Sequence, residues 1–149
     1  MRNFSYQYRG LSESRWWGKD TKLQTKPKYH VLLVDDDDLI RDVVGEMLMA
    51  LGYEVTRAKD GIDALRLFKN GDGVHIVLTD INMPEMDGWQ LADQIKSIKP
   101  DTPIVALTGA ESSRVIPKLS SDGIGKALFK PLRMDHLKDT MLKLVDKLE

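Results

Sequence analysis

The chain has 149 residues, of which 42% are hydrophobic and 30% charged, a balance typical of one globular domain with a hydrophobic core. It contains no cysteine, which excludes disulfide scaffolds, thiolate metal sites and thiol nucleophiles. No apolar run approaches the roughly 20 residues of a membrane span, and none follows the basic N-terminus as in a signal peptide. We therefore expect a cytoplasmic protein with no membrane partner.

The formal net charge of -1 is the sum of two segments of opposite sign. Residues 1–30 carry seven Lys and Arg residues against Glu13 and Asp20, a charge of +5, which leaves -6 for the remainder. The same segment holds six of the ten aromatic residues and shows no sustained periodicity. We expect residues 1–28 to form a basic aromatic N-terminal arm or linker, and residues 29–149 to form the folded domain.

Short apolar runs after residue 28 alternate with stretches of helical spacing, a pattern typical of a parallel α/β sheet. The runs contain few charged residues, as expected for strands that helices cover on both faces. We predict strands at Tyr29–Val34, Tyr53–Arg57, His75–Thr79, Thr102–Leu107 and Lys126–Phe129.

Helices are expected between these strands, over residues 39–51, 61–68, 88–98 and 134–148. In the first, Asp38 is the expected N-cap and Gly52 the stop signal. Its apolar residues fall on one stripe, which is typical of a helix packed on a sheet: Ile40, Val43, Val44, Met47 and Leu51. In residues 112–121, Pro117 would kink or shorten a helix. The repeated strand and helix units predict a three-layer α/β sandwich.

Polar residues follow four of the predicted strands, at the edge where parallel sheets bind ligands. Asp35 to Asp38 follow the first strand, Asp80 the third, Thr108 the fourth and Lys130 the fifth. Carboxylates gathered from neighbouring strands repel one another, and a divalent cation with oxygen ligands relieves this repulsion. Mg²⁺ fits best, because it takes one or two carboxylates and leaves positions for phosphoryl oxygens.

The same residues have roles at a phosphoryl site. Lys130 offers a positive charge to a phosphoryl oxygen, and Thr108 offers a hydroxyl donor. Asp80 is the candidate nucleophile, since it heads a long loop that ends at Gly88 and carboxylates can form acyl phosphates. We also expect the Lys130–Pro131 peptide bond to be cis, an isomer that is accessible at low cost to X-Pro bonds.

Four segments carry a family resemblance: VLLVDDDD, VLTDINMPEMDG, ALTGA and LFKP, in this order along the chain. Together they resemble the receiver domain of two-component response regulators, over residues 29–149. The resemblance implies a doubly wound, flavodoxin-like fold whose five parallel strands lie in the order 2-1-3-4-5.

The resemblance also implies that Asp80 is phosphorylated by a phosphohistidine on a sensor histidine kinase or a histidine phosphotransfer protein, in a Mg²⁺-dependent step. By position, Asp36 and Asp80 would bind the metal through their side chains, Asp35 would support or share it, and Asn82 would contribute its backbone carbonyl. Thr108 and Lys130 would contact the phosphoryl group. Slow autodephosphorylation is expected, without turnover of a separate substrate.

Output would then pass through phosphorylation-dependent binding to a downstream protein, with a homodimer as one form of assembly. In the family, an aromatic residue three positions before the lysine takes part in this coupling. Ala127 occupies that position here, so the usual relay cannot operate in its ordinary form. Since the last predicted helix ends near Glu149, we expect either a single-domain regulator or a receiver from a larger protein such as a hybrid kinase.

Other residues have simpler interpretations. Asp37 and Asp38 favour the start of a helix, and Asp87 favours the turn before Gly88. The histidines His30, His75 and His136 lack partners at metal-ligand spacing and are expected to be structural or at the surface.

Two alternatives remain open. Asp35 and Asp37 form a DxD pair after the first strand, as in aspartate-nucleophile phosphohydrolases of the haloacid dehalogenase type, where Asp35 would be the nucleophile. Two features argue against this alternative: Leu39 stands where that family usually has threonine or valine, and no acidic pair later in the chain completes the metal site. The arm could also act as a nucleic-acid or partner-binding module. The acidic domain would repel a duplex, so we favour packing of the arm on its own or a neighbouring receiver through Trp16 and Trp17.

Overall fold

The computed structural model describes residues 29–71, 73–109, 118–119 and 123–149. Strands and helices alternate as far as the fourth strand, and among the described residues the fifth strand follows the fourth with no helix between them. In chain order they are β1 (His30–Val34), α1 (Asp38–Ala50), β2 (Glu54–Ala58), α2 (Gly61–Asn70), β3 (Ile76–Asp80), α3 (Gly88–Ile98), β4 (Ile104–Thr108), β5 (Lys126–Phe129) and α5 (Met134–Leu148).

The five strands form one sheet in the order β2-β1-β3-β4-β5, and every pair in it is parallel. The predicted strand order is therefore confirmed. Since all five strands run in the same direction, their carboxyl ends meet at one edge of the sheet, which we call the carboxyl edge. Their amino ends meet at the opposite edge, the amino edge.

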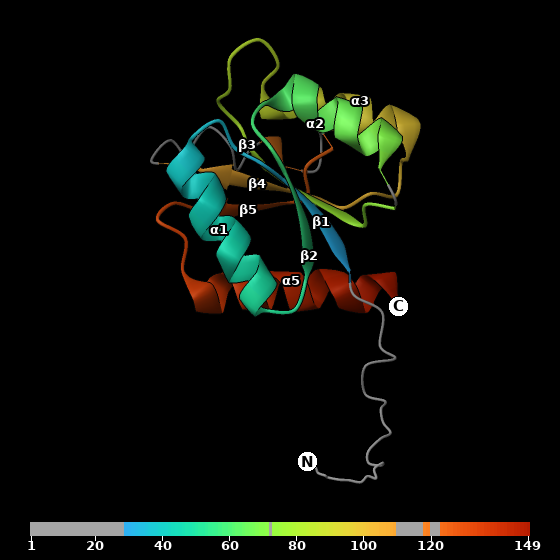
Figure 1. The fold of residues 1–149 in the computed structure, drawn as a ribbon. Helices are drawn as coiled ribbons and strands as arrows, with labels where there is room; N and C mark the ends of the chain where they lie inside the picture. Colours follow the sequence, from blue (N-terminus) through green and yellow to red (C-terminus); the bar gives the residue numbers. More distant parts are fainter. Residues whose placement is uncertain (1–28, 72, 110–117, 120–122) are drawn as a thin grey trace, which may run out of the picture.

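Helices cover both faces of the sheet, with α1 and α5 on one face and α2 and α3 on the other (Figure 1). Successive strand residues point to opposite faces, so each strand contributes to two hydrophobic cores. Leu32 and Val77 belong to the core under α2 and α3, whereas Leu33 and Leu78 belong to the core under α1 and α5. This arrangement confirms the three-layer sandwich.

Three strands end one residue later than predicted at the carboxyl edge: β2 ends at Ala58 and not at Arg57, and β3 and β4 are also one residue longer there. Asp80 and Thr108 were expected just beyond their strands, but they are the last residues of β3 and β4. Both continue the ladder, since Asp80 is registered with Leu107 and Thr108 with Phe129. The two polar side chains are therefore positioned by the sheet itself and not by a loop.

Helix α1 begins one residue earlier than predicted. The N-cap is Asp37 and not Asp38, because the Asp37 carboxylate accepts hydrogen bonds from the backbone N–H groups of Leu39 and Ile40. Asp38 instead lies in the first turn, where its negative charge interacts favourably with the helix dipole. At the other end Gly52 has a φ of 98°, which confirms it as the stop signal.

The apolar stripe of α1 is not wholly buried. Val44 and Leu48 are buried in the core, but Val43 is 49% exposed and Leu39, outside the predicted stripe, is 71% exposed. The helix therefore presents apolar side chains to solvent along part of its length.

The amino edge of the sheet holds a cluster of mutually bonded polar groups. The backbone N–H of His30 donates to Nδ1 of His75 at 2.9 Å, and His30 Nε2 lies 2.6 Å from Oγ1 of Thr56. The Tyr29 hydroxyl donates to Glu149 at 3.0 Å, and its ring meets that of His75 edge-on. His30 and His75 are thus structural, as predicted.

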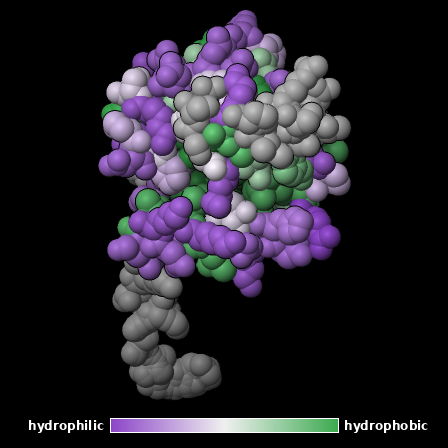
Figure 2. All heavy atoms as spheres, turned by 180° about the vertical axis from the view of Figure 1, so that it is seen from behind, coloured by the Kyte–Doolittle hydropathy of each residue, from purple (hydrophilic) through white to green (hydrophobic). Residues whose placement is uncertain are grey.

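Hydrophilic side chains cover most of the face seen from behind, with α5 along its lower edge and apolar side chains in a discontinuous central area (Figure 2). Among the described residues, no helix combines the length and hydrophobicity that crossing a bilayer requires. The predictions made for residues 1–28, which include Trp16 and Trp17, and for Pro117 lie outside the described residues.

Candidate functional site

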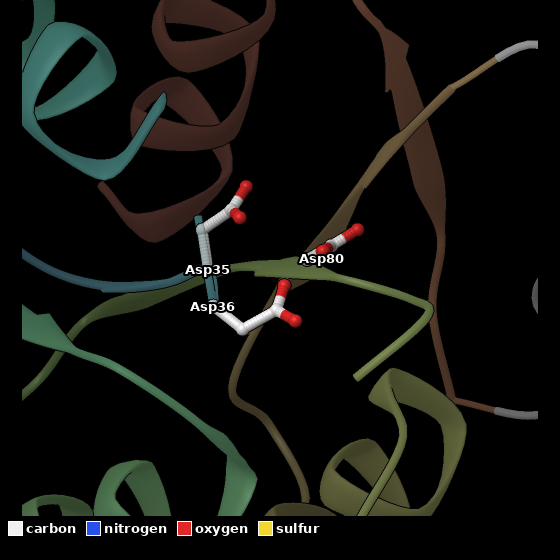
Figure 3. Close-up of side chains that lie close together, drawn as sticks. All are labelled: Asp35, Asp36 and Asp80. Carbon is white, nitrogen blue, oxygen red and sulfur yellow. The ribbon is translucent and has the colours of Figure 1, made fainter. Parts of the chain in front are cut away.

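Three carboxylates meet at the carboxyl edge of the sheet. Asp35 and Asp36 follow β1 and Asp80 ends β3, two strands that are neighbours in the sheet. Each side chain offers an oxygen, and these oxygens all lie within 4.8 Å of one another (Figure 3). The structure therefore brings together the three aspartates that the sequence placed at this edge.

Asp35 is fully buried, whereas Asp36 beside it is exposed. The Asp35 Oδ1 atom accepts a hydrogen bond from the backbone N–H of Asp37 at 2.9 Å. Its carbonyl accepts from the Arg41 guanidinium at 2.7 Å. These bonds join the end of β1 to the first turn of α1, and the bond from Asp37 also orients the buried carboxylate.

Lys130 lies between two of the carboxylates. Its Nζ is 3.1 Å from Oδ2 of Asp35 and 3.4 Å from Oδ1 of Asp80. The buried Oδ2 atom of Asp35 has this ion pair and no further hydrogen-bond partner among the described residues. The Lys130–Pro131 peptide bond is cis, as predicted.

The electrostatics of the site show an excess of negative charge. Burial raises the pKa of Asp80, and the Asp35 carboxylate raises it further, to about 6, although Lys130 acts in the opposite direction. Burial by itself would lower the pKa of Lys130, but the Asp80 and Asp35 carboxylates outweigh it and raise that pKa. One ammonium therefore leaves part of the mutual repulsion uncompensated.

The loop after Asp80 is held at both ends. The backbone N–H of Ile81 donates to Oδ1 of Asp80 at 2.9 Å, and the N–H of Gly88 donates to the carbonyl of Ile81 at 2.8 Å. Asp87 and Gln90 form a reciprocal capping box at the start of α3. The turn residue predicted at Asp87 is thus the N-cap of a helix.

Gly88 is required by its close approach to the end of β3. A Cβ atom at this position would lie 2.5 Å from the carbonyl oxygen of Asp80 and 2.9 Å from Cα of Ile81. Within the same loop Glu85 has a φ of 70°, a conformation that most side chains avoid. The path of the loop is therefore set by backbone contacts.

The remaining predicted residues lie around this cluster. Thr108 is buried at the end of β4, and its carbonyl accepts a hydrogen bond from the backbone N–H of Lys130 at 2.8 Å. Asn82 is exposed in the loop after β3. Ala127 lies in β5 and packs against the core under α2 and α3. The sequence placed these residues near the site, but it did not indicate the role of Arg41, whose only local signal is its spacing from Asp38.

The phosphohydrolase alternative requires Asp35 and Asp37 to face a common ligand. Asp37 instead caps α1 with its carboxylate, and it is absent from the acidic cluster of the described residues. The DxD pair therefore does not converge, and the group that joins Asp35 is Asp80, from a different strand.

Comparison with known proteins identifies a family that the chain matches. The family model of the response regulator receiver domain matches residues 31–142. The sensor histidine kinase RcsC of Salmonella typhi is 34% identical over 111 residues, which are 74% of this chain and 12% of that protein. The chain thus spans about an eighth of the length of this relative.

Solved structures resemble the fold closely. Chemotaxis protein CheY4 of Vibrio cholerae has a TM-score of 0.73 at 31% identity, covering 79% of this chain and 99% of that one. Response regulator protein TrrA of Thermotoga maritima, in complex with Mg(2+)-BeF, has a TM-score of 0.70 at 34% identity, covering 78% and 98%.

Proposed function

The chain belongs to the response regulator receiver domain family, and from this premise we propose that Asp80 accepts a phosphoryl group from a phosphohistidine donor. The family is a signalling module and not a turnover enzyme. The observation that carries the proposal is the juxtaposition of three carboxylates within 4.8 Å, two of which share the ammonium of Lys130. We further propose residues 29–149 as the receiver and residues 1–28 as a separate arm.

The donor set fits Mg²⁺. A hard divalent cation prefers carboxylate and carbonyl oxygens, and this site has an excess of negative charge and a buried Asp35 oxygen without a hydrogen-bond partner. Asp35, Asp36 and Asp80 would hold the ion, with the backbone carbonyl of Asn82 as a further ligand. When bound, Mg²⁺ would supply positive charge to the carboxylates and to the phosphoryl oxygens. The complex of TrrA with Mg(2+)-BeF supports this assignment.

The proposed transfer is a displacement at phosphorus. A carboxylate oxygen of Asp80 forms a bond to phosphorus while the bond from phosphorus to the donor imidazole nitrogen breaks. The electron pair stays on the imidazole, which then takes up a proton from solvent. Asp80 must be ionised to attack, and with a pKa of about 6 it is ionised at neutral pH. Lys130 and Thr108 would hold the phosphoryl oxygens as charge moves onto them.

A receiver implies a histidine kinase as the source of phosphate, and RcsC is itself a sensor histidine kinase. We propose a sensor histidine kinase or a histidine phosphotransfer protein as donor, and a protein target that binds the phosphorylated form. The proposal places the chain in the cytoplasm, where such donors carry their phosphohistidine.

The test is phosphorylation by acetyl phosphate with Mg²⁺, followed by intact mass measurement. We expect one phosphate adduct on the wild type and none on Asp80→Asn. Asp101→Asn is the matched control, since Asp101 is an exposed aspartate, and it should be labelled like the wild type. An equal adduct on Asp80→Asn would refute the assignment.

The same variants test the phosphohydrolase alternative. That alternative expects hydrolysis of p-nitrophenyl phosphate to be lost in Asp35→Asn and kept in Asp80→Asn. We expect no such pattern, because Asp35 is buried and paired with Lys130.

A further inference from the structure

An apolar groove runs beside the acidic site, between α1 and the connection from β5 to α5. Its volume is about 460 Å³. Aliphatic side chains of α1 form one wall, chiefly Leu39, Val43 and Met47, and Pro131 and Leu132 form the other. Leu39 and Val43 are 71% and 49% exposed, so a large part of this apolar wall is open to solvent.

An acidic stripe borders the groove. Asp38, Asp42 and Glu46 are exposed and recur at every fourth residue of α1, which places them on one line along the helix. Leu39 and Val43 follow Asp38 and Asp42 in the sequence and form the neighbouring line. Arg41 pairs with Asp38 and Arg57 pairs with Glu46, so Asp42 is the stripe carboxylate that forms no ion pair among the described residues. A ligand that suits this surface is therefore apolar and carries a positive charge that can reach Asp42.

The N-terminal arm has this chemistry. It carries a net charge of +5 and contains the adjacent aromatic residues Trp16 and Trp17. The arm is also long enough: Trp17 lies twelve positions before Tyr29, and twelve residues span up to about 40 Å when extended. Helix α1, which the arm must pass, has 13 residues and is about 20 Å long.

We propose that the N-terminal arm of the same chain docks in this groove, with Trp16 and Trp17 against the apolar wall and the arm's cations against the acidic stripe. Indole rings bury a large apolar area with few rotatable bonds, which suits them as anchors. Opposite charge then sets the orientation of the arm along α1. The proposal does not rest on phosphorylation at Asp80, although the groove shares Lys130 with the acidic site.

The test uses tryptophan fluorescence of the full chain. Trp89→Phe removes the tryptophan on α3, so that the signal comes from the arm. We expect acrylamide to quench this signal several-fold less in the folded protein than in urea. Leu39→Gln combined with Val43→Thr should restore quenching to the value in urea, because both changes make the apolar wall polar at exposed positions.

Matched controls are Leu142→Gln and Ile62→Thr, which change exposed apolar residues on α5 and α2. Neither should alter the quenching. Asp42→Asn should increase it partly, and so should high salt, because charge supports docking. If the groove variant quenches like the wild type, the proposal is wrong. Shielding that grows with protein concentration would assign the arm to a second copy and would also overturn it.

Methyl NMR gives a second measurement, in case Trp89→Phe fails to fold. In the chain with Trp89 intact, Trp16→Ser with Trp17→Ser should shift the methyl signals of Leu39 and Val43, because ring currents are lost. The methyl signals of Ile62 should stay in place. Unchanged signals at Leu39 and Val43 would overturn the proposal.

Discussion

The two edges of the sheet differ in how fully their polar groups are paired. At the amino edge, His30, His75 and Thr56 bond to one another or to the backbone. At the carboxyl edge, the carboxylates outnumber the ammonium that faces them, and a buried oxygen of Asp35 has no hydrogen-bond partner. One fold therefore holds a polar cluster that is satisfied and one that is not.

The difference shows where binding is to be expected. Unsatisfied buried groups reduce stability, so they persist where a ligand completes them. Satisfied groups need no ligand and contribute to stability alone. We therefore expect substitutions at the carboxyl edge to respond to Mg²⁺ and pH, and substitutions at the amino edge to respond to neither.

Lys130→Met should have the largest effect. Asp35 and Asp80 would lose the ammonium that contacts both, and we expect the free energy of unfolding to fall by about 2–3 kcal/mol in metal-free buffer. Urea denaturation with and without Mg²⁺ is the measurement. Mg²⁺ should recover part of the loss, and a loss that is the same in both buffers would contradict the idea that a cation completes this edge.

Asp80→Asn should stabilise the metal-free protein. Burial and the Asp35 carboxylate raise the pKa of Asp80 from 3.8 to about 6, so the native state holds this proton more tightly than the unfolded chain. Its contribution to stability is complete below pH 3.8 and is lost as the pH rises through about 6.

The neutral amide avoids this loss. After allowance for solvent screening, Asp80→Asn should raise the free energy of unfolding by about 1–2 kcal/mol near neutral pH. The difference from wild type should close as the pH falls towards 4, in a series of urea denaturations. Asp101→Asn, at an exposed site, should show no such pH dependence, and a pH-independent gain in Asp80→Asn would refute the electrostatic cause.

His75→Phe tests the amino edge and should have a smaller effect. The ring is kept, but the backbone N–H of His30 loses its acceptor, which costs about 1 kcal/mol. Denaturation should show this loss, whereas Mg²⁺ affinity and the yield of phosphorylated Asp80 should match the wild type. His136→Phe, on an exposed residue of α5, is the control for the substitution itself. A change in Mg²⁺ affinity would mean that the two edges are coupled.

Tyr29→Phe should have the smallest effect. The hydroxyl donates to Glu149 in an exposed hydrogen bond, and water replaces such a bond readily. We expect a denaturation midpoint within error of the wild type. A clear loss would show that this end of α5 depends on Tyr29 more than its exposure suggests.

Much of the fold was predictable because the three central strands, β1, β3 and β4, are mostly apolar runs and each helix has an apolar face. The predicted ends at Asp80 and Thr108 were wrong by one residue. A residue with a polar side chain can still extend a parallel ladder, because the ladder is made by backbone hydrogen bonds. The N-cap was wrong for a similar reason: Asp37 and Asp38 are identical residues, and only the path of the chain decides which carboxylate reaches the free N–H groups.

The sequence predicted which residues gather at the site, but not the burial of each side chain or the contacts between them. Asp35 and Asp36 are indistinguishable in sequence, yet one is buried and the other exposed, because successive residues at a strand end point in different directions. The bond between His30 and His75 joins residues 45 positions apart. No local pattern reports such a contact, since it follows from the pairing of β1 with β3.

The close approach of Gly88 to Asp80 restricts how this protein could be redesigned. The space that any side chain at position 88 would need is filled by the backbone of Asp80 and Ile81. A side chain at this position would therefore displace either the end of β3 or the first turn of α3. Substitutions in the Asp80–Gly88 loop are therefore expected to be tolerated at its exposed positions Asn82 and Glu85, but not at Gly88, where the loop joins the helix.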